Sequence, residues 1–206
     1  MTRSLPGLVC TLLALTEPAA LAAQPGWLEE PFVQQRLAQG EVVVESGGAF
    51  DPGAPRGQVR AAVRIPAPAE TIWSVMTDCA EALQYVPGLR RCRRIDGAAD
   101  GRWEDIEHEV RYSWLLPGVR YVFRAQYERP HRMDFHRISG DLKTVEGTWL
   151  LTGTRDGTAT LVEYAVYVDP GFWTPQFLVT QTLRKDVSAV LSGLRERVAE
   201  EGRTAR

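Results

Sequence analysis

Four polar, titratable side chains fall in the predicted inward phase of β-strands: His108, Tyr112, Tyr121 and Tyr164. Period-two alternation places them on the same face as apolar residues, because successive side chains of a strand point to opposite faces. An imidazole beside phenol groups on such a face could exchange protons with a carbonyl compound, or it could orient a bound molecule by hydrogen bonds. For His108 alone, a histidine satisfied inside an ordinary core is the simpler explanation.

Large aromatic side chains surround these polar groups in the same inward phase. The aromatic residues that we add to a predicted ligand-binding wall are Trp114, Phe123, Phe135 and Trp149. Plain packing accounts for most residues of this kind, because buried aromatics usually serve the core. Small-molecule sites, however, are also mostly apolar with a few placed polar groups. Core and cavity therefore both stay open at this point.

Other chemistry has little support in the sequence. No serine stands in a G-x-S-x-G setting, no glycine-rich phosphate loop occurs, and no His or Cys spacing matches a metal site, so we expect neither metal nor cofactor. His131 and His136 fall at a turn and on the polar face of a strand, and the carboxylates lie mainly on outward phases. The net charge of −2 gives no reason to expect nucleic acid. Only His108 with Tyr112 or Tyr121 could act as an acid or base on the inward face, so an enzyme is the weaker expectation.

The elements that position these residues follow from apolar alternation and from Pro/Gly turns. Residues 41–46 and a first core strand at 57–65 flank a Gly/Pro-rich turn, and two short helical segments follow, from Pro68 and over Ala80–Val86. Six strands are then predicted: Leu89–Ile95, Arg102–Leu115, Val119–Tyr127, Arg132–Ile138, Thr144–Thr152 and Ala159–Asp169. The pattern predicts an α+β fold, in which a curved antiparallel sheet of about seven strands wraps round one long C-terminal helix.

The C-terminal helix carries a stripe whose character changes along its length. At about 100° per residue, the apolar members of the stripe are Leu183, Val187, Val190, Leu191, Leu194 and Val198. Gln176 and Thr180 fall on the same stripe nearer the start of the helix. Because a solid core would not need polar residues there, we predict a cavity beneath the N-terminal half, with Gln176, Phe177, Thr180 and Leu183 in its wall.

Turn parity places the mouth of this cavity. Successive turns of an antiparallel meander alternate between the two ends of the sheet, so residues 115–118, 139–143 and 169–174 share one end, where the last helix begins. The predicted cavity rim there consists of Leu115, Leu116, Phe172 and Trp173. Leu178 lies roughly opposite the buried stripe. We expect it to face a membrane surface or a partner, because apolar groups off the packing face often mark an interaction site.

The order of elements and three short motifs resemble the START-like (SRPBCC, helix-grip) superfamily, in its polyketide cyclase/dehydrase-like and coenzyme Q-binding branch. The motifs are Pro-x-x-x-x-Trp at 68–73, Val-Pro-Gly at 86–88 and Gly-Thr-Trp at 147–149, and the resemblance spans about residues 57–201. It implies a helix-grip fold with a deep apolar cavity for lipid-like or polycyclic molecules. It does not imply one reaction, because the superfamily contains carriers, sensors and enzymes.

The N-terminus resembles a secretory signal peptide, with Arg3, an apolar stretch and an Ala20-Leu21-Ala22 ending. We predict a signal peptide at 1–22, a leader segment at 23–40 and a single domain at 41–206, in a secreted or periplasmic protein. Export leaves Cys79 and Cys92 in an oxidising compartment, where a disulfide is expected, with two buried thiols as the alternative.

Together these features predict an exported domain that binds or carries a hydrophobic small molecule such as a lipid, a quinone or a polycyclic compound. One alternative is a cyclase/aromatase-like enzyme acting on a polyketide-type substrate, with His108 as proton donor or acceptor. The other is a module whose apolar rim docks on a membrane or a protein.

Overall fold

One antiparallel sheet runs through the computed structural model, which describes residues 26–46, 58–111, 118–171 and 176–204. Within these residues the sheet has eight strands in the order β1-β2-β8-β7-β6-β5-β4-β3. Their bounds are β1 Val43–Ser46, β2 Val59–Ile65, β3 Leu89–Gly97, β4 Trp103–Val110, β5 Val119–Glu128, β6 Arg132–Gly140, β7 Thr144–Gly153 and β8 Thr160–Asp169. Consecutive strands from β3 to β8 pair as a meander, and β2 joins the far side of β8.

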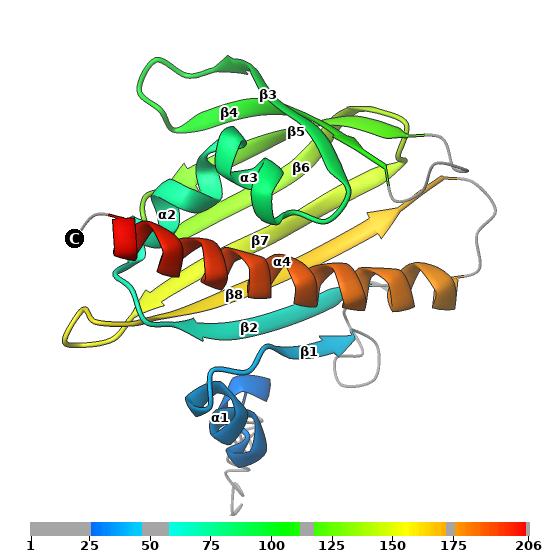
Figure 1. Ribbon diagram of the computed structural model, residues 1–206. Helices are drawn as coiled ribbons and strands as arrows, with labels where there is room; N and C mark the ends of the chain where they lie inside the picture. Colours follow the sequence, from blue (N-terminus) through cyan, green and yellow to red (C-terminus); the bar gives the residue numbers. More distant parts are fainter. Residues whose placement is uncertain (1–25, 47–57, 112–117, 172–175, 205–206) are drawn as a thin grey trace, which may run out of the picture.

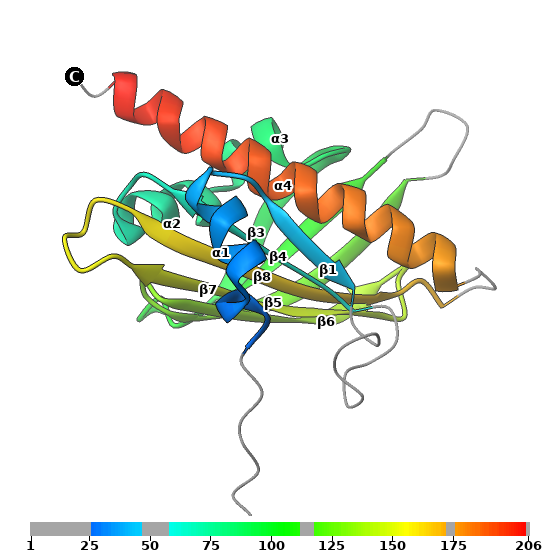
Figure 2. The ribbon, with the colours of Figure 1, turned by 90° about the horizontal axis from the view of Figure 1, so that it is seen from below.

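The helices are η1 Trp27–Glu29, α1 Pro31–Ala38, α2 Ala69–Thr77, α3 Cys79–Tyr85 and α4 Gln176–Thr204. Figures 1 and 2 show α2, α3 and α4 on one face of the sheet, with α4 running along β8 and β2. The predicted α+β helix-grip class is therefore confirmed. No helix in the described part of the chain is both long and apolar enough to cross a membrane.

The expectation of about seven strands was one strand short. The additional strand is β1, which pairs with β2 through Val43↔Ala62 to Ser46↔Val59 at the edge of the sheet. This strand has only four residues and begins with two consecutive valines, so it does not show the alternation of apolar and polar residues by which a strand is recognised in a sequence. The strand predicted over 102–115 is described as Trp103–Val110, and residues 112–117 lie outside the described residues.

The described part of the predicted leader packs on the domain. Helix α1 buries Val33 and Leu37 in a small cluster with Val43 of β1 and Ala62 of β2. Ala62 belongs to the outward phase of its strand, so this cluster is separate from the main core. The α1 segment thus covers a sheet edge that would otherwise be open (Figure 1).

The two halves of α4 meet the sheet differently. Val187, Leu191, Leu194 and Val198 are buried in the main core, in one cluster with residues of α2 such as Trp73, which is 1% exposed. From Phe177 to Asp186, the residues of α4 are only partly buried or exposed. The C-terminal half of the helix therefore closes a solid core, and the N-terminal half does not.

Helix α3 is held in place by three contacts. A disulfide joins Cys79, its first residue, to Cys92 of β3, with the Cα atoms 5.2 Å apart, as the sequence predicted. The Arg197 guanidinium of α4 donates to the Glu81 carboxylate, with Nη2 3.1 Å from Oε1. Gly193 of α4 lies against Tyr85, so closely that an added Cβ would be 2.9 Å from the Tyr85 backbone oxygen. Together these contacts fix α3 over the β3 side of the sheet.

Candidate ligand-binding site

A cavity of about 510 Å³ lies between the inner face of the sheet and the N-terminal half of α4. Residues of β3 to β8 form its floor and walls, and α3 and the end of α2 close one side. The residues of α4 that line it all fall between Leu178 and Val190. Its volume is in the range of about 300–1,000 Å³ that small-molecule sites occupy. The predicted position of the cavity is thus confirmed.

The floor of the cavity is a row of aromatic rings. The rings of Trp149 and Tyr164 stack with centroids 4.0 Å apart and planes 15° apart. The Phe135 ring lies between the rings of Tyr164 and Phe123, with centroid distances of 6.2 Å to Tyr164 and 5.8 Å to Phe123. Gly147 lies beside Phe135, and a Cβ there would be 2.6 Å from the Phe135 ring. A side chain at position 147 would therefore displace the ring that links the two ends of this row.

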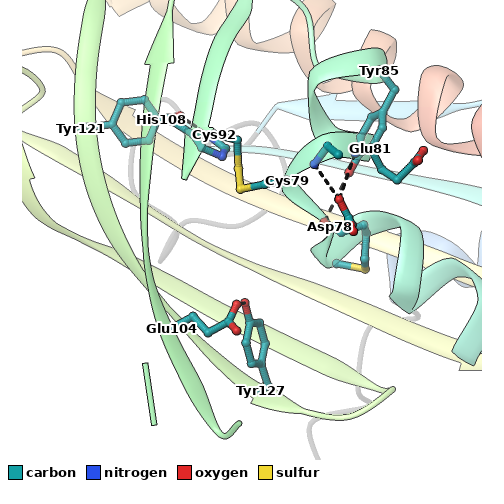
Figure 3. Close-up of a disulfide and its surroundings, with 11 residues drawn as sticks. Asp78, Cys79, Glu81, Tyr85, Cys92, Glu104, His108, Tyr121 and Tyr127 are labelled. Carbon is teal, nitrogen blue, oxygen red and sulfur yellow. Dashed lines mark hydrogen bonds between the residues drawn. A yellow bond between two sulfur atoms is a disulfide. The ribbon is translucent and has the colours of Figure 1, made fainter. Parts of the chain in front are cut away.

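His108 and Tyr121 form the polar pair of the cavity. They are directly opposite residues on β4 and β5, and the Tyr121 hydroxyl is 3.5 Å from His108 Nδ1. The imidazole packs edge-on against Phe123 at 4.9 Å, and Cys92 of the disulfide is its neighbour on β3. Figure 3 shows His108 and Tyr121 next to the Cys79–Cys92 bridge. The pair thus lies among apolar and sulfur-containing groups.

Burial keeps both members of this pair neutral. It lowers the pKa of His108 from 6.5 to about 4, and it raises the pKa of Tyr121 from 10.0 to about 12. Loss of hydration disfavours the charged form of either group. Near neutral pH the pair is therefore an imidazole and a phenol, which can form hydrogen bonds and carry no net charge.

Several polar lining groups were not predicted from the sequence. Tyr85 of α3 and Tyr127 of β5 line the cavity, and burial raises the pKa of both phenols, with Glu104 adding to the effect at Tyr127. The Tyr127 hydroxyl donates to a Glu104 carboxylate oxygen at 3.1 Å. Asp78 and Asp186 also reach the cavity. The prediction considered carboxylates on strands only, and these two aspartates lie at the start of α3 and on α4.

One end of the cavity is formed by turns that the parity argument places together. Val119, Leu142 and Pro170 line the cavity at this end, beside Leu178 at the start of α4. Leu178 is 43% exposed, so it is both part of the wall and accessible to solvent. The exposure of Leu178 agrees with the expectation that it turns outward, and the same side chain also lines the cavity end. The membrane surface or partner that it was expected to face stays a prediction.

The structure places the other predicted site residues as follows. The predicted residues that line the cavity are His108, Tyr121, Phe123, Phe135, Trp149, Tyr164 and Leu183. Tyr112, Trp114, Leu115, Leu116, Phe172 and Trp173 lie outside the described residues, as does the side chain of Gln176. Lining is a geometric finding, and the binding of a ligand by these residues stays a prediction.

Phe177 and Thr180 were predicted in the wall and do not line the cavity; Phe177 is 68% exposed. The lining residues of α4 in this region are Val179, Thr182, Leu183 and Asp186. At 100° per residue, Thr180 is turned 60° to one side of Leu183, whereas Val179 and Asp186 are turned 40° and 60° to the other. The cavity lies toward α3, to one side of α4, so its lining stripe is rotated from the stripe that enters the solid core.

The sequence matches the family described as polyketide cyclase/dehydrase and lipid transport, over residues 65–195. The chain belongs to this family. Comparison with curated proteins gave no match. The matched region begins at the last residue of β2 and ends in α4, so it contains β3 to β8, α2, α3 and the described lining residues of the cavity.

Solved structures share the fold of this family member. A STAR-related lipid transfer protein from Xanthomonas axonopodis has a TM-score of 0.65 at 17% identity, covering 77% of this chain and 93% of that one. A START superfamily protein from Mycobacterium smegmatis has a TM-score of 0.62 at 19% sequence identity, and the match covers 69% of this chain and 97% of that chain. The Zhui aromatase/cyclase from a Streptomyces species has a TM-score of 0.57 at 14% sequence identity, and the match covers 72% of this chain and 95% of that chain. At these identities the similarity shows the START-like fold, which lipid transfer proteins and a cyclase share.

Proposed function

We propose that this domain binds and carries a hydrophobic small molecule, such as a lipid, a quinone or a polycyclic compound, between the sheet and α4. The observation that carries the proposal is the cavity of about 510 Å³, lined mainly by apolar and aromatic side chains. Moving apolar ligand surface from water into such a site is favourable by about 25 cal/mol per Å². Lipid transport in the description of the family supports the proposal.

A cyclase-like activity on a polyketide-type substrate is the second candidate, because His108 and Tyr121 meet inside the cavity. A general base works best when its pKa is close to the working pH, and the pKa of His108 is about 4. This argues for a carrier. The variant His108→Phe separates the two functions, since loss of turnover with binding retained would establish the enzyme.

We also propose that the chain is exported, with cleavage after Ala22 of the predicted signal peptide. The Cys79–Cys92 disulfide supports this, because disulfides persist in oxidising compartments. Expression of the full chain in a bacterium, followed by fractionation and N-terminal sequencing, tests it. A mature protein that starts at Ala23 in the periplasm or medium is expected, and an intact Met1 terminus in the cytoplasm would refute it.

A membrane surface is the proposed partner for loading and release. Phe177 and Leu178 are exposed at the start of α4, next to Leu142 and Pro170 at the cavity end. An apolar ligand that leaves at this end would avoid water if the end lay on lipid. Flotation with phosphatidylcholine/phosphatidylglycerol vesicles should fall for Phe177→Ser and stay unchanged for Phe32→Ser, a matched control on α1 that is 66% exposed. Equal flotation of both variants and the parent would exclude this role of Phe177.

Native mass spectrometry of gently purified protein, compared with solvent-extracted protein, tests the carrier function itself. We expect an additional mass that extraction removes. The thermal midpoint of the extracted protein should rise when lipids, quinones or polycyclic compounds are added, because ligands that bind the folded state stabilise it. A protein that is always empty and shows no thermal shift would contradict the proposal.

A further inference from the structure

A polar pair of the cavity lies at the β4–β5 wall. His108 and Tyr121 lie opposite one another there, beside Cys92. The neighbouring floor, from Phe123 through Phe135 to the stacked Trp149 and Tyr164, consists of aromatic rings. A molecule bound with one end at the β4–β5 wall would therefore meet this hydrogen-bonding pair there and ring faces along the floor.

The His108–Tyr121 pair offers one donor and one acceptor in either arrangement of its protons. If the Tyr121 hydroxyl donates to Nδ1, then Nε2–H of His108 remains a donor and the phenol oxygen remains an acceptor. If Nδ1–H donates to the phenol oxygen, the hydroxyl remains the donor and Nε2 the acceptor. A neutral hydroxyl or carbonyl oxygen fits either arrangement.

No cationic side chain is among the described residues that line the cavity. The described lining residues with carboxyl side chains are Asp78 and Asp186. The Asp78 carboxylate accepts from the backbone N–H groups of Ala80 and Glu81 at the start of α3. Arg197 of α4 lies where this helix contacts α3, and its guanidinium donates hydrogen bonds to Glu81 and Glu200. A carboxylate or phosphate in this cavity would thus lose hydration and find no cation among the described lining residues.

We propose that the cavity selects uncharged, ring-containing molecules that place a hydroxyl or carbonyl oxygen at His108 and Tyr121, and that it excludes anionic amphiphiles such as fatty acids. The aromatic floor favours ring systems, because offset stacking and edge contacts between rings add to the burial of apolar area. The inference rests on the proposed carrier function and narrows its ligand to one chemical class.

The test uses three fluorescent probes with the same ring system: 1-pyrenemethanol, 1-pyrenecarboxylate and pyrene. Titration of the solvent-extracted protein near pH 7.5 should give the tightest binding for the alcohol, with at least about tenfold weaker binding of the carboxylate, equivalent to 1.4 kcal/mol or more. The variants Tyr121→Phe and His108→Phe should each weaken the binding of 1-pyrenemethanol about fivefold, as expected for the loss of one hydrogen bond. Neither variant should change the binding of pyrene.

The outcomes separate this inference from the carrier function. Binding of the carboxylate as tight as that of the alcohol would overturn the charge selection while leaving the carrier function intact. Equal affinity of the alcohol and pyrene in the parent would overturn the role of His108 and Tyr121. Failure of all three probes to bind, with no additional mass in native mass spectrometry, would overturn both the carrier function and the inference.

Discussion

His108 shows how a single residue reports the environment of the cavity. Its imidazole is a member of the lining, is packed by Phe123 and Tyr121, and has its pKa lowered from 6.5 to about 4 by burial. The same environment holds the Tyr121 phenol neutral. Proton transfer at neutral pH would work against both values, whereas hydrogen bonding to a neutral ligand would not.

The lowered pKa of His108 predicts a pH dependence of stability. Between about pH 6.5 and about pH 4 the unfolded chain binds a proton that the folded chain does not, so the free energy of unfolding should fall as the pH is lowered through this range. The free energy of unfolding should fall by at most about 3 kcal/mol, because each unit of difference in pKa between the folded and unfolded states corresponds to about 1.36 kcal/mol. Urea unfolding measured at several pH values should show this fall in the free energy of unfolding for the parent and not for His108→Gln.

Two further groups bear on that measurement. His136→Gln, at an exposed position on β6, is the matched control and should keep the slope of the parent. Burial raises the pKa of Glu163, which acts with the opposite sign and cancels in the comparison, because every variant retains it. The same slope in the parent and His108→Gln would show that His108 is not held neutral by folding.

At the scale of elements, strands were easier to predict than the helix surface. A strand places alternate residues on opposite faces, so the inward assignments of His108, Tyr121 and Phe135 needed only the right parity and are confirmed as cavity lining. On a helix, the lining face depends on where the helix crosses the sheet. Helix α4 packs on α3 through Gly193 and Tyr85, a contact between segments distant in sequence, and Thr180, which was assigned to the wall, does not line the cavity.

Strand β7 depends on the absence of a side chain at Gly147. An added Cβ would be 2.2 Å from the Ala165 backbone oxygen and 2.6 Å from the Phe135 ring, and the backbone atom cannot move aside. We expect Gly147→Ala to lower the free energy of unfolding by about 3 kcal/mol, at the upper end of overpacking effects. The control Gly153→Ala, on the same strand with no atom within 4 Å, should change it by less than about 0.5 kcal/mol. Equal stabilities in urea unfolding would contradict the close packing at position 147.

The disulfide holds α3 over the cavity by closing a short loop between Cys79 and Cys92, which are 13 residues apart. Replacement of both cysteines by alanine should lower the free energy of unfolding by about 3 kcal/mol, largely through the greater entropy of the unfolded chain. Urea unfolding of the parent with reductant should match the double variant. A parent that is equally stable with and without reductant, when mass spectrometry shows free thiols, would contradict this assignment.

For the whole molecule, the division of α4 into a packed half and a hollow half is the central feature. The sequence predicted the α+β class, the order of elements and the position of the cavity, because each depends on local periodicity and on turn parity. It could not predict the acidic lining by Asp78 and Asp186, since helix ends and helix faces meet the cavity only in three dimensions. It also left open whether the space beneath α4 is filled, which depends on the sizes of many side chains together.

Filling the cavity from α4 tests the central claim most directly. Leu183 lines the cavity, and Gln181, two residues earlier on the same helix, is exposed and does not. Pyrene carries no polar group, so its fluorescence titration measures the cavity independently of the His108–Tyr121 pair. We expect Leu183→Trp to weaken pyrene binding at least about tenfold, or 1.4 kcal/mol, and Gln181→Trp to leave it unchanged, with both variants folded by circular dichroism. Equal pyrene binding by the two variants and the parent would contradict a ligand-binding cavity beneath α4.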